Sequence, residues 1–197
     1  MVEEAPIEGA MAVVSTPATE VEADLVTLAE SLADASARFV QTAEAVASGI
    51  AGDQAIAILL LEVADVLANG ARLGAIADVV PEGRFEPDAG VEPDVDRLRA
   101  NLAEQLAPVD AYVEVFDPYA RPELVAGRLS DDLSVIVSDL LHGLAHHAAG
   151  RTLEALWWWQ TTYLSSWGDA GSSAQRALRS LVWHVRSGAP LEVAEQS

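Results

Sequence analysis

The sequence contains no cysteine and no lysine, so every basic residue is an arginine. Without cysteine the chain has no disulfides, no thiol nucleophile and no thiolate ligands for a metal. Nothing in its composition therefore points to an oxidising compartment.

Basic residues are also few, with 11 against 31 acidic ones, which gives a formal net charge of -20. Binding to the phosphates of nucleic acids requires a basic surface, which the chain as a whole lacks. Direct binding to naked nucleic acid is therefore not expected. The 197 residues are 51% hydrophobic, as in a globular protein, and fit a single domain with its own core.

Long apolar runs are missing as well. The longest uncharged stretch within the predicted helices, residues 155–168, is shorter than the ~20 apolar residues of a membrane span and contains polar side chains. The chain starts with two acidic residues among its first four, where a secretory signal needs positive charge. The sequence therefore predicts a cytoplasmic protein that does not cross or bind a membrane.

What remains is a helical pattern over residues 17–187, which predicts one all-α domain of about six mostly antiparallel helices. We expect an acidic disordered tail at residues 1–16 and a flexible tail at residues 188–197. The first helix begins at Thr16-Pro17 and ends near Gly49. The second, from Asp53 to about Val79, is apolar on nearly every side, which is typical of a central helix.

After a loop predicted at residues 80–93, a third helix begins at Asp94, kinks at Pro108 and ends near Phe116. A fourth helix is predicted at residues 130–150 with Ser130 as its cap, a fifth at 152–167 and a sixth at 172–187. The turn at Gly150 resembles the turn of a tetratricopeptide-like helical hairpin. No segment alternates apolar and polar residues as a half-buried strand does, so no sheet is expected.

The fourth helix gathers Asp139, His142 and His146 on the side opposite its leucines. His142 and His146 are one helical turn apart, so both could bind the same divalent metal ion. Asp139 lies seven residues from His146, too far for the two side chains to bind one ion comfortably. Glu62 and Asp65, on a polar stripe of the second helix, are candidates for the missing ligands. The simpler alternative is a solvated polar face on which His142 pairs with Asp139.

Three consecutive tryptophans on the fifth helix cannot share one face, because they fan over ~200° of its circumference. Trp158 is expected to point away from the core, either covered by a loop or the N-terminal tail or exposed as a partner-binding residue. Gln160 falls inside the apolar face and needs buried hydrogen-bond partners. The remaining large residues are expected on the core side: Leu153, Leu156, Trp157, Trp159, Tyr163, Leu164 and Trp167.

The sixth helix carries the only basic patch, formed by Arg176, Arg179, Trp183 and Arg186 on its outer face. Stacking of arginine on tryptophan and the helix dipole explain this patch without a partner. The alternative is a docking face for an acidic protein surface, a phosphate backbone or the acidic N-terminal segment of the chain. The inner face is expected to bury Ala174, Ala177, Leu178, Leu181, Val182 and Val185.

Several strings of the sequence are familiar together: LLLE at 59–62, GARLGA at 70–75, FDPY at 116–119, HGLAH at 142–146, GR at 150–151, EALWWWQ at 154–160 and WG at 167–168. Over roughly residues 20–187 the chain resembles the bacterial domain-of-unknown-function family 5063. The resemblance implies an all-helical cytosolic protein without an established activity. Because genes of this family often neighbour that of the recombination mediator RecR, it also implies a recombination or repair setting.

These observations together predict a non-enzymatic protein-interaction or adaptor module without a cofactor, which contacts a protein partner through Trp158 or the basic patch. One alternative is a metal-dependent or acid/base enzyme that uses the Asp139, His142 and His146 cluster. Another is an accessory of nucleoprotein complexes that acts through protein contacts. The sequence has no phosphate-binding loop, dinucleotide fingerprint, serine hydrolase motif or zinc pattern.

Overall fold

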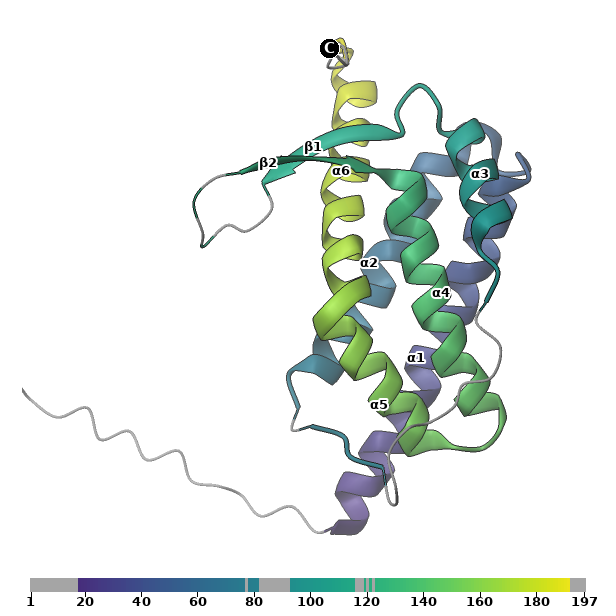
Figure 1. The fold of residues 1–197 in the computed structure, drawn as a ribbon, viewed down its shortest axis with the longest axis vertical. Coiled ribbons are helices and arrows are strands. Elements are labelled where there is room, and N and C mark those ends of the chain that lie inside the picture. The colour runs from purple at the N-terminus through teal and green to yellow at the C-terminus, as the bar shows by residue number, and fades with distance from the viewer. Residues whose placement is uncertain are drawn as a thin grey trace, which may run out of the picture.

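In the computed structural model, the described residues are 18–76, 78–81, 93–115, 119, 121 and 123–191. The acidic tail predicted at residues 1–16, most of the loop predicted at residues 80–93 and the final residues 192–197 lie outside these ranges. The described chain is predominantly helical, as predicted (Figure 1). Its main helices are α1 (Ala18–Ala47), α2 (Ala55–Gly74), α3 (Asp96–Gln105), α4 (Leu129–Ala148), α5 (Thr152–Thr162) and α6 (Gly168–Ser187), with a short 3₁₀ helix, η1 (Gly52–Gln54), before α2.

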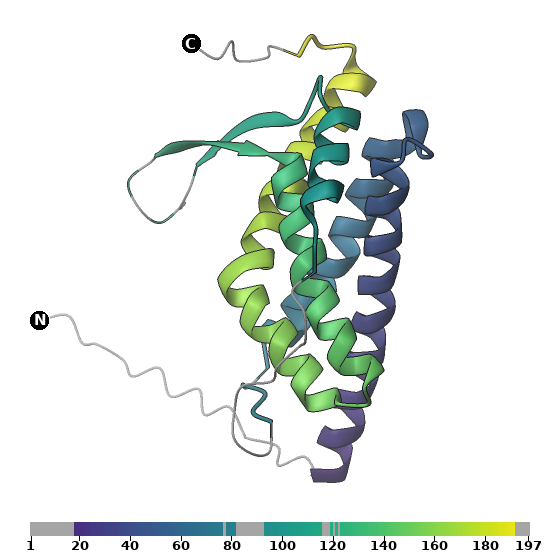
Figure 2. The same cartoon turned by 45° about the vertical axis from the view of Figure 1, so that its right-hand side comes forward.

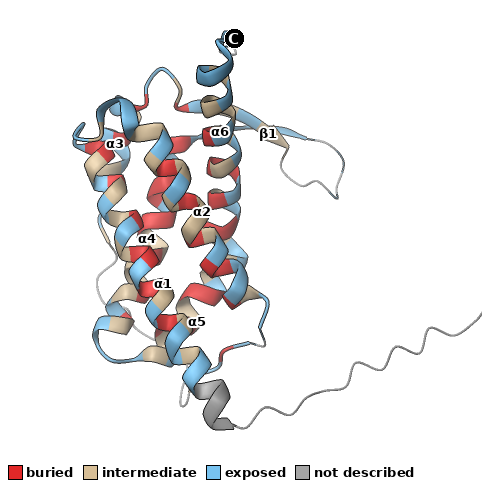
Figure 3. Cartoon of the chain, turned by 180° about the vertical axis from the view of Figure 1, so that it is seen from behind, coloured by how far each residue is buried: buried red, intermediate tan, exposed pale blue. Residues whose placement is uncertain are grey.

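Four helices enclose the core. Contacts join α1 to α2, α2 to α6, α6 to α4 and α4 to α1, so that α2 and α4 occupy diagonal positions in the bundle. The short α3 packs on the outside against α1 and α4. Figure 3 shows buried residues along the inward sides of these helices, and the largest fully buried side chains include Phe39, Leu59, Leu140, Trp159 and Trp167.

The fifth and sixth predicted helices are continuous in the structure. A π-helical turn, η2 (Tyr163–Trp167), connects α5 directly to α6, which begins at Gly168 rather than near residue 172. A side chain at Gly168 would place its Cβ 2.2 Å from the carbonyl oxygen of Tyr163, so the turn requires glycine there. Because a π turn contains more residues than an α turn, faces counted along α5 do not continue unchanged into α6.

The helical hairpin predicted around Gly150 is formed by α4 and α5. Gly150 has a φ of +73°, a left-handed conformation that glycine adopts without strain at the end of a helix. The chain therefore turns back sharply, and α5 packs against α4.

Buried Gln160 sets the end of α2. Its Oε1 accepts a hydrogen bond from the Val79 amide at 2.8 Å, and its Nε2 donates to the Leu73 carbonyl at 2.9 Å. The predicted need of this amide for buried partners is thus confirmed. Because Leu73 and Val79 bond to Gln160, α2 ends at Gly74 and not near Val79 as predicted.

Contrary to the prediction of no sheet, residues 111–128 contain an antiparallel hairpin of β1 (Ala111–Val115) and β2 (Leu124–Arg128). It projects from the bundle in Figures 1 and 2.

The third helix was predicted to continue through Pro108 to Phe116, but α3 ends at Gln105. Proline lacks an amide hydrogen, and its ring would collide with the carbonyl one turn earlier. The valines and tyrosine that follow are typical of a strand.

Asp110 joins the base of this hairpin to the start of α4. Its buried carboxylate accepts hydrogen bonds from the Ser130 amide at 2.7 Å, the Ser130 hydroxyl at 3.0 Å and Arg128 Nε at 2.9 Å. The Asp110 carbonyl also accepts the Leu129 amide. Ser130 was predicted to cap α4 with its own side chain. Instead, the carboxylate of Asp110 accepts the hydrogen bond of the Ser130 amide, which has no acceptor within the helix.

A second contact holds the hairpin against the helices. The hydroxyl of Tyr112 on β1 donates a hydrogen bond to Asp132 in the first turn of α4. Burial raises the pKa of Asp132 to about 7; the Tyr112 bond opposes this shift, and the nearby charges of Glu114, Asp131 and Asp169 add to it. Burial and the bond to Asp132 also raise the pKa of Tyr112 far above its ordinary value, so Tyr112 remains a donor.

Replacing Asp110 with alanine is expected to lower the free energy of unfolding by about 3 kcal/mol, because buried donors lose their acceptor. Urea unfolding followed by circular dichroism measures this loss. Asp96→Ala is the matched control: Asp96 also pairs with an arginine, Arg99, but on the surface, where a pair contributes about 0–1 kcal/mol. Equal losses in the two variants would contradict a special role for Asp110.

Stability is also expected to depend on the protonation of Asp132. Folding raises its pKa from 3.8 to about 7, so this contribution is fully present below pH 3.8 and is lost as the pH rises through about 7. Between about pH 5 and pH 8, the free energy of unfolding should therefore fall more for the parent than for Asp132→Asn, which cannot ionise. Urea titrations at both pH values measure this, and parallel behaviour of the two proteins would refute it.

Candidate functional site

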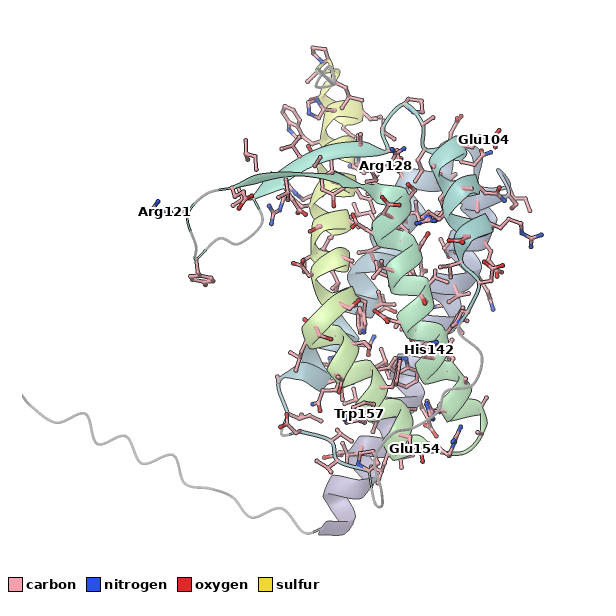
Figure 4. All side chains as sticks on the ribbon, in the orientation of Figure 1. Glu104, Arg121, Arg128, His142, Glu154 and Trp157 are labelled. Atoms are coloured by element: carbon pink, nitrogen blue, oxygen red, sulfur yellow. The ribbon has the colours of Figure 1, made fainter. Side chains whose placement is uncertain are left out.

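The α4–α5 hairpin brings together residues that the sequence analysis treated as two separate sites. The Trp158 ring on α5 lies with its centroid 4.8 Å from that of His142 and 6.2 Å from that of His146, both on α4. Glu154 of α5 and Asp139 of α4 complete a group that we call the polar seam. In Figure 4, His142 and Glu154 lie toward the same end of the α4–α5 pair.

His146 is completely buried, which corrects the prediction of a solvated histidine face. Its Nδ1 lies 3.0 Å from a carboxylate oxygen of Glu154, and the same oxygen is 3.2 Å from Arg151. The turn at Gly150 is the reason, because it folds α5 back over this side of α4. A carboxylate on Nδ1 orients the imidazole and leaves its Nε2 facing the protein interior.

Buried polar atoms without a hydrogen-bond partner are concentrated in the polar seam. Within the described part of the chain they include Asp139 Oδ2, both ring nitrogens of His142, His146 Nε2 and Trp158 Nε1. Burial raises the pKa of Asp139, although the hydroxyl of Ser166 and the charge of His142 act to lower it. Each unpartnered buried atom costs about 1–3 kcal/mol, so the seam is less stable than an apolar contact would be.

The two carboxylates predicted as additional metal ligands lie on another face. Glu62 and Asp65 of α2 both form ion pairs with Arg38 of α1. Glu62 Oε2 lies 3.8 Å from Arg38 Nε, and Asp65 pairs with the Arg38 Nη2 nitrogen. Their helix is diagonal to α4, so the structure does not bring them to the histidines. Among the described residues, no three histidines or carboxylates are grouped so that they could hold one metal ion.

Trp158 is half-buried against the histidines rather than fully exposed. Its neighbour Trp157, predicted in the core, is also half-buried and lines a shallow depression of about 330 Å³ with Val80 and Leu164. Leu164, another predicted core residue, is 65% exposed. It lies in η2, where the wider turn shifts the helical register and rotates the side chain outward.

All four residues of the predicted basic patch, Arg176, Arg179, Trp183 and Arg186, are exposed on α6; we call this set the α6 face. Trp183 is 56% exposed and contacts the ring of His184, with centroids 4.9 Å apart. The three arginines form no ion pair with any described residue. By contrast, Arg38, Arg128 and Arg151 each pair with a carboxylate.

A depression of about 300 Å³ lies at one end of the α6 face, lined by Leu60 of α2 together with Ser172, Gln175, Arg176 and Arg179 of α6. At the other end, the last turns of α6 extend past the neighbouring helices (Figure 2). This extension explains why Val185, predicted to be buried, is 78% exposed. The α6 face is therefore bordered by α2 at one end and stands clear of the neighbouring helices at the other.

The polar seam could have been predicted from the symmetry of the sequence about Gly150. His146 and Glu154 each lie four residues from Gly150, and His142 and Trp158 each lie eight residues from it. In a tight antiparallel helical hairpin, residues equally distant from the turn lie opposite each other. The depression lined by Leu60 and Gln175 has no such signal in the sequence, because α2 and α6, which pack together to form it, are far apart along the chain.

Together these features define a four-helix bundle with a projecting β-hairpin, a polar seam and a basic helix face whose arginines form no ion pair with the described residues. Residues 23–184 match the family described as a domain of unknown function, DUF5063, and the chain belongs to this family. The resemblance drawn from the sequence motifs is thus confirmed. No curated protein matches the chain. None of the helices in the described ranges has the length and apolar character needed to span a bilayer.

Among solved structures, the chain is similar to protein BF1032 from Bacteroides fragilis, a structural-genomics target. The TM-score is 0.65 at 19% sequence identity, and the match covers 83% of this chain and 94% of the other. A likeness at this identity shows that the two proteins share a fold.

Two adjacent tryptophans provide a test of the polar seam. Trp158→Phe is expected to cost at most about 1 kcal/mol of stability, because it removes an indole nitrogen that has no partner. Trp159→Phe should cost about 2–3 kcal/mol, because Trp159 is fully buried and its Nε1 donates to the Leu140 carbonyl at 3.2 Å. Urea unfolding compares them, and a larger loss at Trp158 would show that its nitrogen is satisfied.

Proposed function

We propose that this protein is a non-enzymatic interaction module that docks a protein partner on the α6 face. The observation that carries this proposal is the exposure of three arginines and one tryptophan on one side of α6, without an ion pair from the described residues. Tryptophan and arginine are the residues that most often dominate binding energy at protein interfaces.

Charge supports the same conclusion. Acidic residues outnumber basic ones 31 to 11, so arginines have many potential partners within the chain. Arg38, Arg128 and Arg151 use such partners, whereas the three exposed arginines of the α6 face pair with no carboxylate of the described residues. A positive surface on a negatively charged molecule orients an approaching acidic partner and accelerates its association.

A second candidate function is favoured by one observation, the unpartnered ring nitrogens of His142 and His146 in the polar seam. Such atoms suit metal binding or proton transfer. Elemental analysis of protein purified without chelators, compared with His142→Ala, tests this candidate. A stoichiometric metal that the variant loses would favour it over the interaction module, and no metal in either protein would count against a metal site.

A role beside nucleoprotein complexes, in a recombination or repair setting, would be a special case of the interaction module. It predicts that the protein is retained on DNA only when its protein partner is present. Retention by DNA alone would contradict contact through a partner.

Photo-cross-linking tests the interaction module directly. A benzophenone amino acid at position 183 is expected to capture one discrete partner polypeptide in cells, and Arg179→Glu should reduce the yield at least about tenfold. Position 61 is the matched control, because Leu61 of α2 is 68% exposed but lies outside the α6 face. The same products at both positions, or a yield at 183 that does not respond to Arg179→Glu, would refute the proposal.

A further inference from the structure

We infer that the partner segment is an acidic amphipathic helix that anchors a side-chain carboxylate in the depression between α2 and α6. This inference rests on the proposed function and assigns the chemistry of the partner. A second carboxylate of the same helix reaches Arg186, and an apolar side chain between the two packs on Trp183.

The depression has the chemistry of a carboxylate site. Arg176 and Arg179 are one helical turn apart and both line it, so their guanidinium groups can donate to one carboxylate from two sides. The amide of Gln175 adds donors at the same place. The Ser172 hydroxyl already donates to the Gly168 carbonyl at 2.7 Å, so the donors available to a ligand belong to the other three side chains.

Leu60 makes the depression different from a plain arginine pair. Its half-buried side chain forms the apolar part of the lining, so the methylene groups of a glutamate can pack there while its carboxylate meets the arginines. Partial removal of water strengthens the charge-assisted hydrogen bonds at this end of the α6 face. Arg186, farther along the helix, lies outside the depression.

Residue spacing along α6 favours a helical partner. Trp183 follows Arg179 by four residues, and Arg186 follows Trp183 by three, so the contact groups repeat along ~10.5 Å of one helix face. A helix with two glutamates seven residues apart and a leucine between them presents groups at the same distances. A nucleic acid, with one phosphate per ~3.4 Å of each strand, carries many more charges than a helix with two glutamates, so it is repelled more strongly by a protein with a net charge of -20.

Fluorescence anisotropy with a labelled peptide tests the inference. The probe is an acetylated and amidated helical peptide with glutamate, leucine and glutamate at this spacing, so that no terminal carboxylate competes with the side chains. It should bind the full-length protein, and Arg179→Glu should weaken binding at least about tenfold. Gln175→Glu, which adds a charge to the depression but keeps both arginines, should weaken it to a similar extent.

Arg97→Glu is the matched charge control, because Arg97 is an exposed arginine on α3, away from the α6 face. It should change the affinity less than about twofold, by long-range effects alone. Lysine in place of the anchoring glutamate of the peptide should restore binding to Arg179→Glu. Equal weakening by Arg97→Glu and Arg179→Glu would overturn the inference, as would preferential binding of a single-stranded DNA oligonucleotide over the peptide.

The peptide and the cross-linking experiment together distinguish failure of the acidic-helix inference from failure of the proposed function. If the peptide does not bind while the cross-link at position 183 forms and depends on Arg179, the acidic-helix inference fails and the interaction module stands. If the peptide binds as expected but no partner is captured at position 183, the proposed function fails although the α6 face recognises acidic helices.

Discussion

The buried carboxylate of Asp110 fixes the junction on which the other elements depend. It accepts the free amide at the start of α4 and the side chain of Arg128 at the end of the hairpin, and so sets both the first residue of α4 and the base of β1 and β2. Helix α4 contacts α1, α3, α5 and α6. Its starting point therefore determines which of its side chains face the core, the hairpin and α5.

Much of the helical architecture follows from local signals. Periodic apolar residues, the glycine at the α4–α5 turn and the apolar character of α2 identify the bundle, because each depends on neighbours in the sequence. The hairpin was not predictable in the same way. Its strands are short, and their positions depend on Pro108, which ends α3, and on the Asp110 bonds, which join residues distant in the sequence.

The two candidate surfaces differ in the same way: local sequence signals predict one of them, and the other depends on packing between helices. The outer side of α6 could be predicted from the sequence because one regular helix determines it. The burial of His146 could not, since it depends on how closely α5 covers α4. Trp158 is not among the side chains that pack on the hydrophobic core; it lies over the histidines, because the polar side of α4 is itself covered by α5. A helical wheel gives a direction but not what lies in that direction.

The π turn between α5 and α6 fixes the angular relation between two surfaces that share one continuous helix. Five residues of a π turn cover about the same rotation as four α-helical residues, so the same five residues coiled as a regular α-helix would turn everything beyond them by roughly 90° relative to the indoles before them. Arg176 and Trp183 would then be turned away from the side of the bundle on which they are now exposed. The coiling of this short segment therefore determines where the α6 face points, and its composition is constrained as well, because Trp167 is completely buried and Tyr163 lies closely against Gly70 and Gly168.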